Sequence, residues 1–355
     1  MSNKHMYIDF HVLQTVPPSC VNRDDMGSPK TAVYGGAIRA RISSQAQKHA
    51  MRLMFSEIFD AGQCGLRTKR SVKLVADKLI ASKGLSEEEA KSQAKNLFDN
   101  AVTKEGKKMK MKNADGGTDA LFFISDAQAE ALSKADPKDK AGCKEALKGT
   151  PSIDMALFGR MVASDPSLNY DACAQVAHAI STHAVENEYD YFTAVDDLSP
   201  DDNAGAGHIG TVEFNSSTLY RYATVDVTSL RGLIGGDTAE AVRGFCEAFV
   251  RAMPTGKQNT FANRTLPDLI YVTVRGDQPV NLAGAFEAPV KAREGYAAES
   301  GKRMAEYAAR LYANYSGDPE AAFVVGETGF GDAKKVNFRQ LLDEVAALAA
   351  EGLDK

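Results

Sequence analysis

Long apolar runs are missing from this chain of 355 residues. A membrane-spanning helix needs about 18 or more consecutive apolar residues, and no stretch approaches that length. The first residues, MSNKHMYIDFHVLQTV, carry Lys4, Asp9 and His11 where a signal peptide would have a compact apolar core. We therefore expect a cytoplasmic protein without a membrane partner.

Paired cysteines are also missing. The five cysteines are scattered, and no C-x-x-C pair occurs among them. This spacing favours neither a zinc ribbon nor a disulfide framework. We expect reduced thiols that pack as small apolar residues.

Motifs for catalysis or cofactor binding are scarce. The sequence has a G-x-G-x-x-G run at Gly205, Gly207 and Gly210, but SPDDNA precedes it and strand-like TVEFN follows, which is the wrong context for a dinucleotide site. No P-loop, nucleophile elbow or H-E-x-x-H occurs. The pairs Asp24-Asp25 and Asp196-Asp197 sit beside turn residues. We expect no catalytic residue, no cofactor and no metal.

The histidines give no metal-ligand spacing. His178 and His183 are five residues apart on an expected helix, so they do not share one face. His208 could in principle join them, but no cysteine or carboxylate spacing supports a metal site. We interpret them as structural or surface histidines.

Acidic residues are absent from one stretch of an acidic protein. The chain has a net charge of -5, yet no Asp or Glu lies between Met26 and Ser56. Five bases lie there: Lys30, Arg39, Arg41, Lys48 and Arg52. A face that only keeps a protein soluble normally mixes both signs, so this stretch favours an anionic partner.

The spacing of these bases predicts a track for phosphates. Arg39 and Arg41 are two apart on an expected strand at 37–42, and Lys48 and Arg52 are four apart on a helix starting at Ser43 or Ser44. Side chains four apart on a helix lie about 6 Å from each other, comparable to neighbouring phosphates along a strand. The helix start would present unpaired N–H groups. The alternative is a solubilising face.

The rest of the chain indicates an α+β protein. Alternating residues predict strands at 6–13, 219–227, 269–274 and 321–325, with helices from Asp237 to Pro254 and at 298–313 and 336–351. Between them, 60–185 has helical periodicity around 72–83, 86–101, 126–134 and 170–185, and 188–218 is typical of a long hairpin-like excursion. Without these two insertions the order is compatible with a split βαβ, ferredoxin-like core.

Several long motifs resemble a known family. The stretch HVLQTVPPSCVNRDDMGSPKTAVYGGAIRARISSQAQKHAMR is followed by ALFGRMVAS, AHAISTHAVENEYDYFTAVDDL, GAGHIGTVEFNSSTLYRYATVDV, TGKQNTFA and AFEAPVKAREG. Together they resemble the CasC family, the repeated backbone subunit of the type I-E CRISPR complex Cascade. The resemblance spans about residues 6 to 300 and is weaker in 60–150 and in the C-terminal tail.

The resemblance implies an architecture and partners. It implies an RRM-like palm at 1–59 and 219–355, helical fingers at 60–187 and a hairpin thumb at 188–218. Several copies would stack head-to-tail along one CRISPR RNA, without catalysis, and present its bases to target DNA. Further partners would be the large subunit, the small subunits and the end-capping subunits of Cascade.

The resemblance also implies RNA-binding residues. These are Arg23, Lys30, Arg39, Arg41, Ser43, Gln45, Lys48, Arg52, Lys257, Gln258, Lys291 and Arg293, with Met161 as an apolar wedge beside a displaced nucleotide and Thr193 on the thumb. For Met161 the alternative is an ordinary core methionine. Ala37 departs from the family pattern, since some members carry another base near it.

Two other functions stay open at this point. One is an RNA-processing or RNA-cleaving subunit of a CRISPR effector, for which Asp24 and Asp25 are the nearby acid or base candidates. The other is a stand-alone RNA chaperone.

Overall fold

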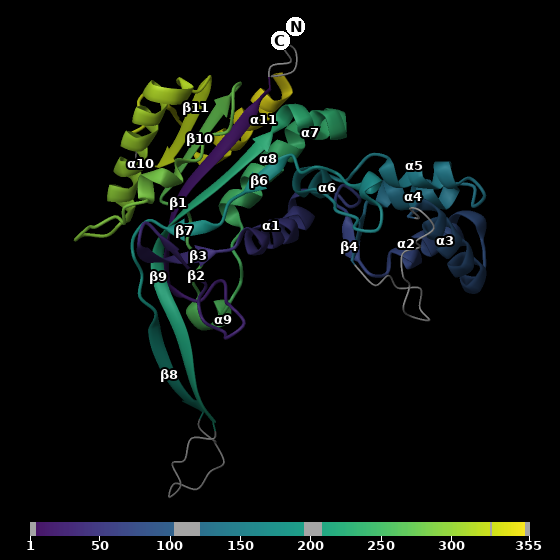
Figure 1. Cartoon of the computed structure of the whole chain (residues 1–355), viewed down its shortest axis with the longest axis horizontal. Coiled ribbons are helices and arrows are strands. Elements are labelled where there is room, and N and C mark those ends of the chain that lie inside the picture. The colour runs from purple at the N-terminus through teal and green to yellow at the C-terminus, as the bar shows by residue number, and fades with distance from the viewer. Residues whose placement is uncertain (1–4, 103–120, 195–207, 327–328, 352–355) are drawn as a thin grey trace, which may run out of the picture. The chain divides into compact units, whose positions relative to one another are not determined.

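The computed structural model describes residues 5–102, 121–194, 208–326 and 329–351. The chain forms two compact units (Figure 1). The sheet unit comprises residues 1–51, 176–224 and 245–344, and the helical unit comprises 52–175, 225–244 and 345–355. The expected boundaries of palm, fingers and thumb differ from the boundaries of these two units. That division remains a prediction.

The sheet unit is built on a large sheet whose strands run in the order β12-β11-β10-β1-β9-β7-β3-β2. Their bounds are β1 Tyr7–Ser19, β2 Thr31–Tyr34, β3 Ala37–Ile42, β7 Ala179–Ser181, β8 Glu188–Ala194, β9 His208–Asp226, β10 Leu269–Arg275, β11 Ala321–Gly326 and β12 Lys334–Lys335. The predicted strands at 6–13, 269–274 and 321–325 are confirmed. All seven residues of β10 are buried, as expected for a central strand.

Helices cover both faces of this sheet. Helices α9 Gln258–Phe261 and α10 Ala297–Leu311 belong wholly to the sheet unit, as do the short helical turns at Leu282–Phe286 and Tyr312–Ser316. Helices α1 Ser44–Ile58, α8 Thr238–Arg251 and α11 Phe338–Glu351 belong in part to each unit. The helical unit holds α7 Val227–Ile234 and the turns at Pro166–Leu168 and Gly235–Asp237. Phe10 of β1 contacts the rings of Phe245 and Phe249 of α8. Leu13 points to the opposite face and packs in a core cluster with Met304 of α10.

A buried polar layer lies beneath α10. Tyr222 donates to Asp9 at 2.9 Å, and the backbone N–H of Val280 donates to the same carboxyl at 2.8 Å. Burial raises the pKa of Asp9 to about 6. His11 lies 2.9 Å from the Tyr220 hydroxyl, and burial lowers its pKa to about 3.

The helical unit confirms the expected helices around 72–83, 86–101 and 126–134. Its elements are β4 Leu66–Thr68, α2 Ser71–Lys83, α3 Glu87–Ala101, β5 Phe122–Ile124, α4 Asp126–Lys134, α5 Lys140–Lys148 and α6 Ile153–Phe158. Leu79, Leu97, Leu132 and Leu147 are fully buried in one core cluster. The apolar stripes of short amphipathic helices thus meet in a core of their own.

The expected helix at 170–185 is wrong. Residues Ala174–Val176 form β6 and Ala179–Ser181 form β7, and β7 pairs with both β3 and β9. The alanines of this stretch favour a helix locally, but pairing on both sides of β7 supplies backbone hydrogen bonds that outweigh a weak propensity.

The excursion after residue 187 is a two-stranded antiparallel ribbon (Figure 1). β8 and β9 pair from Glu188↔Phe214 to Ala194↔His208, and all seven residues of β8 are exposed. Asp196-Asp197 and the first two glycines of the G-x-G-x-x-G run lie outside the described residues. Among the helices that the structure describes, none is long and apolar enough to cross a membrane.

Candidate nucleic-acid interface

The start of α1 is capped by side chains from three segments. Ser43 accepts the N–H of Ala46 at 3.2 Å, and Asn22 accepts the N–H of Ser43 at 2.9 Å. His178 accepts the N–H of Ser44 through Nδ1 at 3.3 Å. The expectation of unpaired donors at these positions is therefore wrong, and Ser43, which is 6% exposed, is a capping residue.

Two cations surround the His178 ring. Arg41 of β3 places its guanidinium 3.3 Å from His178 Nδ1. The backbone N–H of Arg41 donates to the carbonyl of Lys30, and that of Lys30 donates to Asn22. Burial first, and then the charges of Arg41 and Lys30, lower the pKa of His178. We call Lys30, Arg41 and His178 the α1-start cluster.

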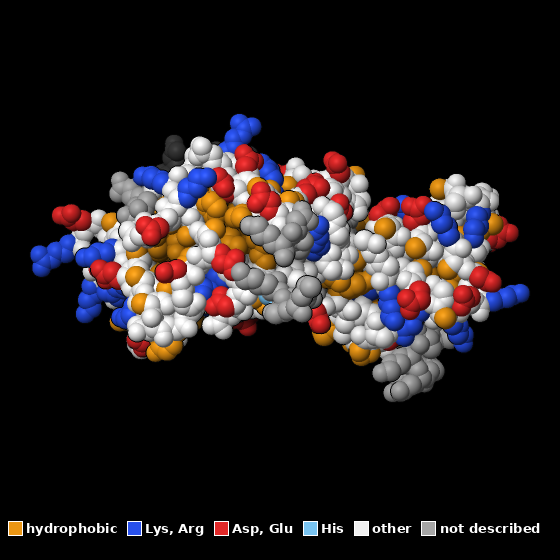
Figure 2. All heavy atoms as spheres, turned by 90° about the horizontal axis from the view of Figure 1, so that it is seen from above, with side chains coloured by type: hydrophobic (Ala, Val, Ile, Leu, Met, Phe, Trp, Pro, Cys, Tyr) orange, Lys and Arg blue, Asp and Glu red, His pale blue; other side chains and the backbone are white. Residues whose placement is uncertain are grey.

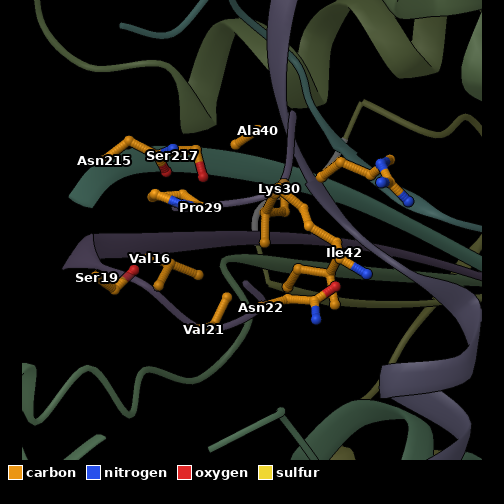
Figure 3. A pocket seen from close by; sticks show the side chains of 12 residues that line it. Val16, Ser19, Val21, Asn22, Pro29, Lys30, Ala40, Ile42, Asn215 and Ser217 are labelled. Carbon is orange, nitrogen blue, oxygen red and sulfur yellow. The ribbon is translucent and has the colours of Figure 1, made fainter. Parts of the chain in front are cut away.

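A small pocket lies beside the α1-start cluster, between β1, β3 and β9. Lys30, Asn22 and Ile42 project into this region together (Figure 3). Its volume is about 20 Å³. That is room for one water molecule and far too little for a nucleotide base. The cluster therefore suits contact with a backbone phosphate at the surface.

The turn from Thr255 to Ala262 packs directly against the loop that follows β1. A Cβ on Gly256 would lie 2.5 Å from the carbonyl oxygen of Val21, so only glycine permits this approach. Lys257 and Ala262 hold φ angles of 50° and 46°, on either side of α9. Such left-handed positions are costly for residues other than glycine and concentrate at functional sites.

Because of this packing, Arg23 and Lys257 both lie near Cys20. Burial raises the pKa of the Cys20 thiol; the charges of Arg23 and Lys257 oppose that rise, and those of Glu213 and Asp24 add to it. Open hollows of about 520 Å³ and 450 Å³ lie along the two loops. Gln258 lies in the second of them, beside Lys257. Arg23 and Lys257 thus add cations to the surface along the loop that carries Asn22 and Lys30, where Asp24 and Asp25 also lie.

Asp24 holds its own loop closed. Its Oδ1 accepts the N–H groups of Met26 at 2.9 Å and Ser28 at 3.0 Å, and Arg23 forms a β-bridge with Pro29. The sequence reading of Asp24 as a turn residue agrees with this geometry.

Arg39 does not reach the surface. Its side chain is 0% exposed and donates to the carbonyls of Ser181 at 2.9 Å, Phe286 at 2.9 Å and Glu287 at 3.1 Å. The guanidinium therefore anchors the β2–β3 hairpin to the backbone beside it. The expected phosphate contact of Arg39 is corrected to a structural role, because all these acceptors belong to the protein.

Arg52 is also committed to the protein. Its Nε donates to Asp154 at 2.9 Å and its NH2 group donates to the carbonyl of Gly65 at 3.2 Å. The guanidinium further lies over the ring of Phe123. We therefore correct the expected Lys48–Arg52 phosphate track: of the two, Lys48 remains as an RNA-binding candidate.

The remaining candidates lie at accessible positions. Gln45 is exposed on the first turn of α1, and Lys48 is half-buried one turn later, where burial lowers its pKa. Thr193 is exposed near the end of β8, and Met161 in the helical unit is 83% exposed, so the core-methionine alternative is wrong. Lys291 and Arg293 are exposed on the segment before α10.

Sequence reasoning missed two residues of this surface. His178 was expected on a helix, yet it lies just before β7 and contacts β3 and α1. Asn22 joins the loop after β1 to the start of α1. A histidine within the alternating stretch AHAIS was the available signal for a strand. The capping role of Asn22 depends on tertiary contact and leaves no local signal.

The α1-start cluster differs in charge pattern from other parts of the surface. On the face shown in Figure 2, Lys and Arg side chains are interspersed with Asp and Glu. The charged groups that act on His178 are both cations. A mixed face is what solubility alone requires, so the cluster calls for a different explanation.

Comparisons with known proteins identify relatives. The chain resembles a solved chain from a structure titled "CRISPR RNA-guided surveillance complex, pre-nicking", with 32% identity and a TM-score of 0.81 over 97% of this chain and 100% of that one. A chain from a "CRISPR RNA-guided surveillance complex" is 28% identical, with a TM-score of 0.64 over 97% of this chain and 99% of that one. No curated protein matches. Residues 8–348 match the model of the family Cas_CT1975, described as CT1975-like protein, and the chain therefore belongs to that family.

Proposed function

We propose that the protein is a non-catalytic, RNA-binding backbone subunit of a CRISPR RNA-guided surveillance complex, of the CasC kind found in type I-E Cascade. Two observations support this. Its fold matches, over nearly its whole length, chains from solved surveillance complexes. Its sheet unit also carries the α1-start cluster, where Lys30 and Arg41 meet without an acidic neighbour acting on His178.

The chemistry of the surface suits a guide of any sequence. Cations and N–H donors bind phosphate oxygens, which fix the register of an RNA without reading its bases. The pocket beside the cluster is too small to hold a base. Recognition of target DNA would then rest on base pairing with the guide, as in other RNA-guided systems.

The proposed assembly has several copies of the chain on one CRISPR RNA. Head-to-tail contacts do not close on themselves, so growth would continue until end-capping subunits stop it. The large and small subunits of Cascade would bind along this filament, in the cytoplasm. The sheet unit would serve as an RRM-like palm, the helical unit as fingers and the β8–β9 ribbon as a thumb.

The observation that supports the proposal most directly is that Lys30 and Arg41 lie together beside the start of α1. Reversing the charges of these residues tests the proposal. We would mix the purified chain with a CRISPR RNA and count copies per RNA by native mass spectrometry. Several copies are expected for the wild type, and few for a variant with Lys30→Glu and Arg41→Glu. A matched control is Lys302→Glu, an exposed lysine of α10 in the same unit. Assembly of the double variant equal to that of the control would contradict the proposal.

The alternative function is that of a nuclease, and an RNA-cleavage assay tests it. The chain would be incubated with CRISPR RNA or target RNA and a divalent metal. We expect no cutting. Reproducible cutting that is lost in both Asp24→Ala and Asp25→Ala would overturn the non-catalytic role. Two variants are needed because Asp24 also closes its loop.

A further inference from the structure

The contacts of His178 determine which of its two ring nitrogens carries the hydrogen when the ring is neutral. The Ser44 N–H and the Arg41 guanidinium both lie 3.3 Å from Nδ1. Both groups can only donate hydrogen bonds, so Nδ1 must be the acceptor. In the neutral ring the single N–H group is then at Nε2. The contacts of His178 therefore select one tautomer, with a donor at Nε2.

The surroundings keep this ring uncharged. Lys30 approaches from the segment before β2, Arg41 from β3, and the N-terminal end of α1 adds the positive end of its helix dipole. All three disfavour a second proton, and burial adds to them, so the pKa of His178 is lowered. Protonation of Nδ1 would also break its two hydrogen bonds.

The other nitrogen is available to a ligand. His178 is exposed, and its hydrogen bonds to other described residues both use Nδ1. The ring that carries this donor contacts the Arg41 guanidinium through Nδ1 and feels the charge of Lys30, and both cations attract anions. A phosphate oxygen accepts such a hydrogen bond readily, since hydrogen bonds to charged acceptors are stronger than neutral ones.

We propose that His178 is a further RNA ligand of this protein: its Nε2–H donates to the oxygen of a phosphodiester that Lys30 and Arg41 hold by charge. This inference rests on the proposed function and adds to it a residue and a mode of binding. His178 acts here as a neutral donor. Because its pKa is lowered from the ordinary value of 6.5, we expect the contact to vary little between about pH 7 and 8.

A competing explanation is that His178 only caps α1. The two roles use different ring nitrogens and can be separated by substitution. Asparagine places its amide oxygen near the position of Nδ1 and cannot reach the position of Nε2. Glutamine places its amide nitrogen near the position of Nε2 and gives up the Nδ1 acceptor.

The test compares His178→Asn and His178→Gln with the wild type. Binding to a fluorescent CRISPR RNA would be measured by anisotropy, and folding by thermal melting followed by circular dichroism. We expect His178→Asn to melt like the wild type and to lose RNA affinity about tenfold. We expect His178→Gln to keep most of the affinity and to melt at a lower temperature. Wild-type affinity in His178→Asn would overturn the inference.

A pH series gives a second readout. Wild-type affinity between about pH 7 and 8 should stay level at constant salt, because the pKa of His178 is lowered from the ordinary value of 6.5. Affinity that rises steadily as pH falls, and that loses this trend in His178→Gln, would overturn the neutral-donor role. If the wild type fails to bind RNA at all, the proposed function falls as well. A pH or asparagine result against His178, with normal RNA binding by the wild type, overturns only this inference.

Discussion

The Nε of Arg52 and the Oδ2 of Asp154 lie 2.9 Å apart, and the Asp154 side chain is only 2% exposed. The same carboxylate accepts the N–H of Gly65 and the hydroxyl of Ser152. Arg52 therefore pairs with a buried carboxylate that also accepts hydrogen bonds from Gly65, just before β4, and from Ser152, just before α6.

Removing this pair should destabilise the helical unit. Arg52→Ala leaves a buried carboxylate without its cation, and we expect the free energy of unfolding to fall by about 3 kcal/mol. Urea denaturation followed by circular dichroism measures it. The control is Lys73→Ala, which removes an exposed pair with Asp77 and should cost less than about 0.5 kcal/mol. Equal losses in the two variants would contradict the structural role of Arg52.

The two arginines show how far sequence reasoning reaches here. Strand 37–42 and a helix from Ser44 were predicted from alternation and helical periodicity, and both are confirmed. The groups that the Arg39 and Arg52 side chains contact could not be predicted from the sequence. Most of their acceptors lie 102 to 248 residues away in the chain, and the nearest, the Gly65 carbonyl, is 13 residues away. Only the folded structure brings these groups together. Local spacing places a charge on a face but does not tell what that face meets.

Arg221 should be a second sensitive position. It is 0% exposed and donates to Gln14 at 2.7 Å and to the carbonyls of Phe249 and Ala252 at the end of α8. Arg221→Met leaves those carbonyls buried and unpaired, so we expect a loss of about 3 kcal/mol or more in unfolding free energy. Arg251→Ala, on the exposed side of the same helix end, should change it by less than about 0.5 kcal/mol. A wild-type denaturation midpoint in Arg221→Met would refute this.

Gly256→Ala should weaken RNA binding without changing any charge. The added methyl group would lie 2.5 Å and 2.6 Å from the carbonyl oxygens of Val21 and Cys20, so the turn carrying Lys257 has to move away from Arg23. We expect a loss of several-fold in affinity, measured by anisotropy with a CRISPR RNA. Gly232→Ala is a matched control because its Cβ would meet nothing within 4 Å. Unchanged affinity in Gly256→Ala would remove Lys257 from the interface.

Stability should depend on pH through Asp9. Its folded pKa of about 6 lies above the ordinary value of 3.8, so the folded state binds this proton more tightly than the unfolded chain. The stabilisation is complete below about pH 4 and is lost as pH rises through about 6, a span of about 3 kcal/mol. His11 acts in the opposite direction, because its folded pKa of about 3 is below 6.5.

The difference between the wild type and Asp9→Asn isolates the first effect, since His11 is present in both. Denaturation at pH 4, 5, 6 and 7 should show the wild type losing stability relative to Asp9→Asn as pH rises. A difference that stays constant across this range would show that Asp9 ionises in the fold as it does in the unfolded chain.

The β8–β9 ribbon has a consequence for the order of events during assembly. All residues of β8 are exposed, so this strand pair buries too little apolar surface to be stable on its own. In the proposed assembly, a partner that closes over the ribbon would have to fix its exposed side chains at a cost in conformational entropy. Each copy added to an assembly would thus bind more weakly than its contact area implies, but could dissociate and rebind until its register is correct.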